Sequence, residues 1–368
     1  MKTFGFFILL WGVLVPRGYG QSDSRFADRR LNEIQMIGSH NSYKKALDPS
    51  LLKFIAVLVP QLAASLQYEH IPLDEQLNLG LRNLELDVVF DPDGGRYAEP
   101  LGLRIMNCFS SAHAPYDSAQ DLKKPGLKVM HVPDFDFRSH QLLFTDCLRV
   151  IKKWSDHHKN HIPIFITVNA KDDQLSLPGT IAPLPFTPSA LHSIDTEIRS
   201  VFSEDDLITP ELIKGAHRTL EEAILNAGWP KIHDVKGRVL FVLDETGPKL
   251  DAYLGPGRDS SSGNVMFVNA KEGTPNAAIR IVNDPIESTA YITRLVQQGY
   301  LVRTRADADT KQARENNYDR FTQAGRSGAQ IITTDYYLPS KFFSSPYCVE
   351  FTDHNYVRTN KVVHKSGK

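Results

Sequence analysis

Short apolar runs recur along the chain, and most of them are followed by a segment in which apolar residues repeat at helical spacing. The runs are rich in Val, Ile and Leu and are bounded by turn residues, which is typical of buried strands. They predict strands at residues 34–37, 81–90, 127–131, 162–169, 238–243, 265–268, 300–304 and 329–333. The intervening pattern predicts helices near residues 72–80, 139–158, 190–202, 219–227, 286–298 and 311–326.

This alternation of strands with helices or long connections favours a parallel sheet with helices outside it. Eight such units in a chain of 368 residues predict an α/β fold, a TIM-type (β/α)₈ barrel with long βα loops. An open doubly wound sheet is the competing fold. It is disfavoured because no glycine-rich phosphate-binding loop follows the first strand. In a (β/α)₈ barrel the chemistry lies at the carboxyl ends of the strands.

Polar residues stand at several of these predicted strand ends. The segment Gly38-Ser39-His40-Asn41-Ser42-Tyr43 follows the first strand, and His131 ends the third. Glu85 and Asp87 lie two residues apart in the second strand, so their side chains face the same way. Two carboxylates on one face of an apolar strand are costly unless they are paired or metal-bound. Such oxygens suit Ca²⁺ or Mg²⁺, and with two histidines they favour metal-assisted phosphoryl transfer.

The later predicted strands also end on polar residues, including Asn169, Asp244 and Asp335. Arg303 and Arg305 stand at and just past the seventh strand, beside Asp307 and Asp309 in sequence. Guanidinium groups suit phosphate oxygens, so these arginines are candidates for binding the substrate. An ion-pair network that holds the loop explains the same residues equally well. Asp244 could orient a hydroxyl group, and its strand-end position is the only indication.

The composition is that of an ordinary globular enzyme, and it excludes one class of partner. Basic and acidic residues number 42 and 43, so the net charge is −1 and no nucleic acid partner is expected. The chain has three cysteines, Cys108, Cys147 and Cys348. One disulfide with a single thiol left over is possible in an oxidising compartment, and the sequence does not choose the pair.

The first residues have the pattern of a secretory signal. Lys2 precedes an apolar core at residues 4–15, and small residues follow near position 20. The apolar core is too short to span a membrane comfortably. We therefore expect residues 1–20 to be a signal peptide and the protein to be secreted. Residues 21–368 are then the barrel, which we expect to be a monomer.

A further apolar run, residues 51–62, follows the first strand and therefore lies near the rim of the expected active site. We expect it to be a buried packing helix. The alternative is that it inserts into lipid at a membrane surface.

Several of these segments resemble a known family. The motif at 38–43, Glu-Leu-Asp-Val at 85–88 and His131 resemble the catalytic half of calcium-dependent phosphoinositide-specific phospholipases C. Val-Arg-Thr-Arg-Ala-Asp-Ala-Asp-Thr at 302–310 and Ser-Gly-Ala-Gln-Ile-Ile-Thr-Thr-Asp-Tyr at 327–336 resemble the secreted, single-domain branch of bacteria and fungi. The resemblance covers nearly all of the chain after the signal. It implies the barrel fold, a phospholipid substrate at a membrane surface, and Ca²⁺ as cofactor.

The resemblance also implies roles for individual residues. Asn41, Glu85 and Asp87 would bind Ca²⁺, and His40 and His131 would flank the phosphate. His131 is then expected to protonate the leaving diacylglycerol oxygen, with His40 as the stabiliser. The inositol 2-hydroxyl would attack the phosphorus, giving inositol 1,2-cyclic phosphate, which water can open. Apart from the resemblance, the neutral composition and the lack of a clear basic rim make plain phosphatidylinositol the expected substrate.

One position departs from the pattern of the animal enzymes. Where they have a calcium-binding glutamate at the end of the fourth strand, this chain has Asn169. An amide still offers an oxygen, but it lacks the negative charge and weakens the site. Lys171, two residues further on, is a candidate for binding a substrate phosphate or inositol hydroxyl, with a solvated loop lysine as the alternative.

Two other functions remain open at this point. A glycerophosphodiester phosphodiesterase-like hydrolase shares the barrel, the histidine pair and the Glu-x-Asp arrangement, but begins its motif with His-Arg-Gly, where this chain has His40-Asn41-Ser42. A secreted barrel that has lost activity and binds phosphate or sugar is favoured only by Asn169. Calcium-dependent turnover of phosphatidylinositol distinguishes the three.

Overall fold

The computed structural model describes residues 23–108, 113–256 and 263–363 of the chain. The expected signal peptide at residues 1–20 lies outside these ranges. Within them, no helix combines the length and the hydropathy needed to cross a lipid bilayer.

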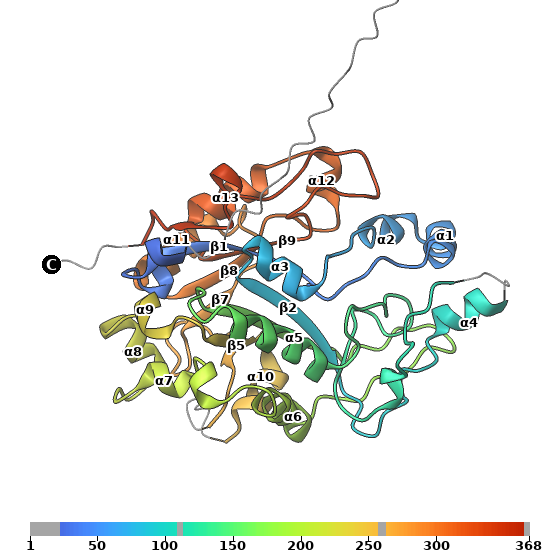
Figure 1. Cartoon of the computed structure of the whole chain (residues 1–368), viewed down its shortest axis with the longest axis horizontal. Helices are drawn as coiled ribbons and strands as arrows, with labels where there is room; N and C mark the ends of the chain where they lie inside the picture. Colours follow the sequence, from blue (N-terminus) through green and yellow to red (C-terminus); the bar gives the residue numbers. More distant parts are fainter. Residues whose placement is uncertain (1–22, 109–112, 257–262, 364–368) are drawn as a thin grey trace, which may run out of the picture.

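Eight parallel strands form the centre of the molecule (Figure 1). They are β1 (Ile34–Ser39), β2 (Asn83–Val89), β4 (Ile164–Ala170), β5 (Val239–Leu243), β6 (Phe267–Val268), β7 (Ile279–Ile281), β8 (Leu301–Arg305) and β9 (Ile331–Thr334). Their order in the sheet is β6-β5-β4-β2-β1-β9-β8-β7. A parallel bridge between Asn269 and Ile279 then joins the two ends of this row. The predicted (β/α)₈ barrel is therefore confirmed.

Two of the strands differ from the prediction. Residues 127–131 do not form a barrel strand: β3 (Lys128–Val129) pairs antiparallel with the end of β2, inside a long βα connection. The sixth barrel strand, β7, was not predicted, because three residues with an arginine in the middle form no apolar run. The predicted number of strands is right only because these two errors cancel. A further strand, β10 (Val357–Thr359), pairs antiparallel with the first half of β1.

Helices surround the strands and fill the connections. At the predicted places are α3 (Leu73–Leu79), α5 (Phe144–His157), α6 (Pro188–Arg199), α8 (Leu220–Asn226) and α11 (Thr289–Gln298). The predicted helix at 311–326 is two, α12 (Lys311–Glu315) and α13 (Asp319–Ser327), because Asn316 adopts a left-handed backbone (φ 48°) between them. The others are α1 (Pro49–Leu58), α2 (Pro60–Ser65), α4 (Leu101–Cys108), α7 (Pro210–Lys214), α9 (Ile232–Val235) and α10 (Gly247–Leu254). Short 3-10 turns lie at Asp23–Phe26, Leu31–Glu33, Asp121–Lys123, Glu204–Asp206 and Thr352–His354.

The helices bury one apolar stripe each against the barrel. In α5 the residues that face the core recur every three or four positions, which is the spacing of one helix face. They are Phe144, Cys147, Leu148, Ile151 and Trp154, all buried. Removal of this apolar surface from water is what holds the helix to the sheet.

The glycine that opens the 38–43 motif has a structural cause. Gly38 pairs with Asn83 where β1 meets β2, and a Cβ atom at Gly38 would lie 2.5 Å from the Asn83 side chain. No other residue allows the two backbones to approach this closely. Two hydrogen bonds follow just beyond: Ser42 N donates to the Glu85 carbonyl (3.0 Å), and Glu85 N donates to Ser42 Oγ (2.7 Å). The close approach thus sets the motif beside the carboxylates of β2.

The apolar run at residues 51–62 forms α1 and α2, and its tip is exposed. Leu51 and Ile55 are buried, but Val57 is 83% exposed, Leu58 64% and Leu62 47%. The expectation of a buried packing helix is therefore wrong for this tip, because α1 has only one face against the protein. Figure 1 shows α1, α2 and α4 on one side of the molecule, beyond the carboxyl end of β2.

The three cysteines are free thiols, so the disulfide that the sequence allowed does not form. Cys147 is buried in the core face of α5, and burial raises the pKa of its thiol. Cys348 is half-buried and donates to the Tyr337 carbonyl (3.2 Å), whereas Cys108 is exposed at the end of α4. They lie on separate elements.

Candidate functional site

His40 stands directly after β1, and its imidazole is held by a carboxylate from the neighbouring strand. Its Nδ1 donates to Asp335 Oδ1 (2.8 Å), and Asp335 follows β9 directly. Arg305 contacts the same pair, 3.3 Å from His40 Nδ1 and 3.4 Å from Asp335 Oδ2. The other ring nitrogen, Nε2, lies 3.6 Å from Glu85 Oε1. Burial, and then the charge of Arg305, lowers the pKa of His40, so its imidazole is neutral and Nε2 can accept a proton.

The two carboxylates of β2 lie at the centre of the site and are surrounded by donors from the chain itself. Arg303 of β8 forms a buried ion pair with Glu85. Asn169 of β4 donates through Nδ2 to Glu85 (3.3 Å) and to Asp87 (3.0 Å). Lys171 Nζ lies 3.6 Å from Asp87 Oδ2, and the charge of Asp87 raises the pKa of the Lys171 amine. Two positive side chains therefore balance the two carboxylates.

Asn41 is fixed beside them by its own backbone and by one hydrogen bond. It adopts a left-handed conformation (φ 50°), which asparagine tolerates better than most residues. Its side chain is buried, and Nδ2 donates to the Tyr68 hydroxyl (2.7 Å). This hydrogen bond uses the nitrogen of the amide and leaves the oxygen for a cation.

His131 belongs to a turn and not to a strand end, which corrects its predicted position. It lies two residues beyond β3, and its Nδ1 donates to Asp136 Oδ2 (2.9 Å). Asp136 also pairs with the buried Lys44 (3.1 Å). Although burial raises it, Lys44 and His131 hold the pKa of Asp136 below its ordinary value. Lys44 in turn lies over the ring of Tyr68 (4.6 Å), the residue that binds Asn41, so the two halves of the site are connected.

The remaining predicted residues lie around this centre. Asp244 follows β5 and accepts from Asn269 Nδ2 (3.1 Å); burial raises the pKa of Asp244. Asp307 is buried behind Asp335 and accepts from its backbone N–H (2.9 Å). Arg303 and Arg305 are thus both paired with carboxylates, which is the ion-pair network that the sequence left as an alternative.

Three residues of the site were missed or given little weight from the sequence alone. They are Asp335, Asp136 and Tyr68. Asp335 was at a predicted strand end, so a signal existed. Asp136 follows His131 by five residues in a turn, and Tyr68 lies in a long connection. Nothing in the local pattern indicates that the chain folds back at these two residues to reach His131 and Asn41.

The donor set fits Ca²⁺ in its chemistry. Glu85, Asp87, Asn41 and Asn169 offer carboxylate and amide oxygens, the ligands that Ca²⁺ prefers. Among the described residues there is no cluster of three or more His, Cys, Asp or Glu side chains that could hold a metal. Two of the four ligands would thus be amides, and Asn169 would have to turn its oxygen toward the cation.

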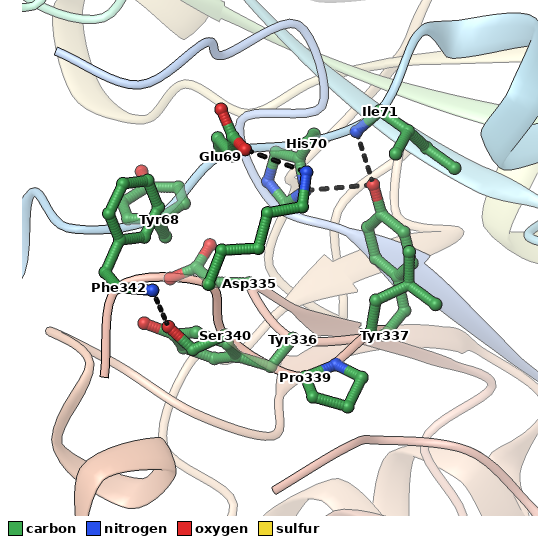
Figure 2. Close-up of a pocket in the computed structure, with 12 residues that line it drawn as sticks. Tyr68, Glu69, His70, Ile71, Asp335, Tyr336, Tyr337, Pro339, Ser340 and Phe342 are labelled. Carbon is green, nitrogen blue, oxygen red and sulfur yellow. Dashed lines mark hydrogen bonds and ion pairs between the residues drawn. The ribbon is translucent and has the colours of Figure 1, made fainter. Parts of the chain in front are cut away.

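A small cavity of about 30 Å³ lies beside the site and is lined by aromatic residues, as Figure 2 shows. His70 stands at its edge. Its Nε2 donates to the backbone carbonyl of His40 (2.7 Å), and its Nδ1 accepts from the Tyr337 hydroxyl (3.2 Å). Tyr337 also accepts from the Ile71 backbone N–H (3.2 Å). His70 therefore positions the backbone from which the His40 side chain extends.

The chain is similar to known proteins over most of its length. A sequence model of the family described as "Phosphoinositide phospholipase C, Ca2+-dependent" matches residues 29–361. A solved structure of the calcium-dependent phosphoinositol-specific phospholipase C from the Gram-negative bacterium Pseudomonas sp, in its myoinositol complex, is 17% identical with a TM-score of 0.54. The match covers 91% of this chain and 97% of that one. The corresponding enzyme from Streptomyces antibioticus is 18% identical with a TM-score of 0.51, over 87% of this chain and 99% of that one. A comparison with curated proteins gives no match.

The buried His70 makes a prediction about stability and pH. Burial lowers its pKa from 6.5 to about 4. Between these values the unfolded chain binds a proton that the folded protein does not, so stability falls as the pH falls. The loss amounts to at most about 3 kcal/mol for this one group.

Urea unfolding at pH 7 and pH 4.5 tests this. His70→Gln should flatten the pH dependence relative to the wild type, because the variant lacks the titrating group. His157→Gln, at an exposed histidine of α5, is the matched control and should leave the pH dependence unchanged. The interpretation fails if both variants show the same pH dependence as the wild type. Groups such as Asp307, whose pKa is raised to about 7 by burial, titrate in all three proteins and cancel in the comparison.

Proposed function

This chain belongs to the family of calcium-dependent phosphoinositide phospholipases C, which are phosphodiester-cleaving enzymes, and from that premise we propose that it cleaves phosphatidylinositol. The products are diacylglycerol and inositol 1,2-cyclic phosphate, or inositol phosphate after water opens the ring. The observation that carries the proposal is the pair of histidines, His40 and His131. Each donates through Nδ1 to a buried carboxylate, which leaves Nε2 of each ring for the substrate.

The geometry supports different roles for the two histidines. His40 is neutral and its Nε2 lacks a proton, since Nδ1 is the donor to Asp335. It is therefore suited to accept the proton of the attacking inositol 2-hydroxyl, a role beyond the stabiliser that the sequence suggested. His131 is the acid that protonates the leaving diacylglycerol oxygen, as the sequence suggested. Asp136 stabilises the positive charge that the imidazole of His131 carries before this transfer.

Ca²⁺ would be held by Glu85, Asp87 and the amide oxygens of Asn41 and Asn169. When bound, it lowers the pKa of a coordinated hydroxyl and neutralises charge on phosphoryl oxygens. Lys171 and Arg303 already neutralise the two carboxylates. The Lys171–Asp87 ion pair stands where the cation would bind, so Lys171 would be released from Asp87 and its amine would be free for a phosphate oxygen of the substrate.

The head group follows from the same pairing. Lys171, Arg303 and Arg305 are each engaged with a carboxylate of the site. Arg303 and Arg305 stay paired, and Lys171, once released, is used by the phosphodiester, so none of the three is left over for additional phosphates on the inositol ring. Unphosphorylated phosphatidylinositol is accordingly the proposed substrate. Asp244, close enough to Arg303 and Asp87 for their charges to influence its carboxyl group, is a candidate for contact with an inositol hydroxyl.

The exposed apolar tip of α1 and α2 supports contact with a lipid surface. Val57 and Leu58 are exposed neighbours in sequence, and the exposed Leu62 follows four residues later. The helices α1 and α2 that carry them lie beyond the carboxyl end of β2 (Figure 1). A soluble protein rarely exposes such residues in a group without a binding role. We propose that this tip enters the lipid interface while the substrate head group reaches the barrel. Secretion through the signal at residues 1–20, and a monomeric state, are parts of the same proposal.

The first experiment is phosphorus NMR of the protein with phosphatidylinositol vesicles, with Ca²⁺ or with a chelator. A cyclic phosphodiester signal that requires Ca²⁺ is expected. His131→Ala should slow its formation by about 10²- to 10⁴-fold, because the acid is lost. His157→Ala is the control and should react like the wild type. The assignment is wrong if Ca²⁺-dependent turnover persists in His131→Ala at the rate of the control. Absence of turnover in the wild type would instead favour a different phosphodiester or a non-catalytic binder.

The second prediction concerns the affinity for Ca²⁺. Asn169→Glu restores a third carboxylate and should tighten Ca²⁺ binding by about tenfold or more. Asn226→Glu makes the same change of charge at an exposed position of α8 and should have no such effect. Calorimetric titration with Ca²⁺, without substrate, measures both. If the two variants bind Ca²⁺ as the wild type does, the metal is not held at Asn169.

The third prediction concerns the lipid surface. The double substitution Val57→Ser and Leu58→Ser should weaken binding to phosphatidylcholine vesicles that contain phosphatidylinositol by about tenfold or more, since less apolar surface is buried. Leu225→Ser removes an exposed leucine on α8, far from this tip in Figure 1, and is the control. Sedimentation of vesicles measures binding, and a short-chain monomeric substrate measures turnover without a surface. Equal vesicle binding by all three proteins would exclude the tip as the contact.

A further inference from the structure

A basic groove lies on the outside of the barrel, away from the proposed active site. It encloses about 390 Å³ and is lined by the start of β1, the last turns of α13, and the segment from β10 to Val362. Three of its side chains are positively charged: Arg326, Arg358 and Lys361. Within residues 23–108, 113–256 and 263–363, no carboxylate forms an ion pair with any of them. Gln35 lines the groove at the start of β1, and His40 follows the end of the same strand. Because a strand rises about 3.3 Å per residue, the five residues between these positions separate the groove from the proposed active site.

Arg358 is held in one orientation by three contacts. Its guanidinium lies over the Phe351 ring, 4.1 Å from the ring centre. Its Nε donates to Gln35 Oε1 (2.9 Å). Its Nη2 lies against α13, where a Cβ atom added at Gly325 would be only 2.8 Å away. These contacts fix the plane of the guanidinium, and Arg358 lines the groove.

Gln35 is itself fixed, which makes the arrangement rigid. It is buried, and its Nε2 donates to the carbonyls of Gly325 (3.2 Å) and Ala329 (2.9 Å). Its Oε1 can then only face Arg358. A side chain oriented in advance loses little entropy when it binds a ligand. This network therefore holds the Arg358 guanidinium ready to donate hydrogen bonds to an anion.

Two of the three positive charges, those of Arg326 and Lys361, have simpler explanations. Arg326 lies in the last turn of α13, where a positive charge is favoured by the helix dipole alone. Lys361 is exposed, as most lysines are. Neither explanation covers Arg358, which belongs to the strand β10 and is half-buried. Burial lowers the pKa of its guanidinium, and no negative side chain offsets that effect. A partly desolvated cation of this kind is stabilised when an anion binds.

We propose that this groove binds a phosphate- or sulfate-bearing ligand, with Arg358 as the central contact and Arg326 and Lys361 at the rim. A planar guanidinium can donate two parallel hydrogen bonds to two oxygens of such a group. The apolar Phe321 and Val362 also line the groove, so there is room for a non-polar part of the ligand. The site is independent of the proposed phospholipase activity.

Calorimetric titration of the full chain with inorganic phosphate tests the proposal, at low ionic strength with chloride as the reference anion. Arg358→Gln should weaken phosphate binding by about tenfold or more, because a charge-assisted contact is lost. Lys236→Gln removes an exposed positive charge elsewhere and should leave the affinity unchanged. Gly325→Ala keeps every charge but displaces the guanidinium, and should also weaken binding. Equal affinity in the wild type and Arg358→Gln overturns the proposal.

Two further arms make the result unambiguous. If Arg358→Gln does not fold, the double substitution Arg326→Gln and Lys361→Gln, at two exposed positions, replaces it. A several-fold loss of phosphate affinity is then expected, and no loss would overturn the site. Phosphatidylcholine vesicles with phosphatidic acid distinguish the source of the phosphate. Vesicle binding that depends on Arg358 assigns the ligand to a lipid. Binding of inorganic phosphate that depends on Arg358, without binding of the vesicles, assigns a soluble ligand.

Discussion

The burial of two carboxylates at the mouth of the barrel is the constraint on which the rest of the site depends. Glu85 and Asp87 are removed from water, and a charge in that position is costly without compensation. The compensation comes from Arg303, Lys171 and the amide of Asn169. These come from β8 and β4, on both sides of β2. The closed barrel is what brings donors from distant parts of the sequence to one pair of oxygens.

This compensation gives the departure at Asn169 a physical meaning. A third carboxylate at this position would be a further buried negative charge, whereas the amide donates one hydrogen bond to each of the two that are present. The site is therefore close to neutral as the chain builds it. Under the proposed function, a bound cation would add positive charge to this balance, and the negative phosphate of the substrate would offset it.

The sequence was informative where function and local pattern coincide. His40, Asn41, Glu85, Asp87, Asn169 and Asp335 all stand at strand ends or in a strand with clear alternation, and the fold brings them together as expected.

The sequence was uninformative where a contact depends on the path of a long connection. His131 reaches the site through a turn that is closed by Asp136, and Tyr68 arrives from the segment between α2 and α3. Hydrophobic periodicity describes faces of elements and contains nothing about where a turn-rich loop returns. The three-residue strand β7 was not predicted for a related reason. It is a strand because it pairs with β8, and its composition does not indicate one.

The pairing of β10 with β1 has a consequence for how this protein is made. The strand β1, which leads into the motif at 38–43, has β2 as its neighbour on one side, but β9 and β10 complete its other pairings. Both of these strands are separated from β1 by roughly 300 residues of sequence. Contacts of such long range form late, because the entropy of closing the loop is lost before the contacts are gained. The barrel therefore cannot close around its first strand before β9 and β10 have been synthesised and have reached it.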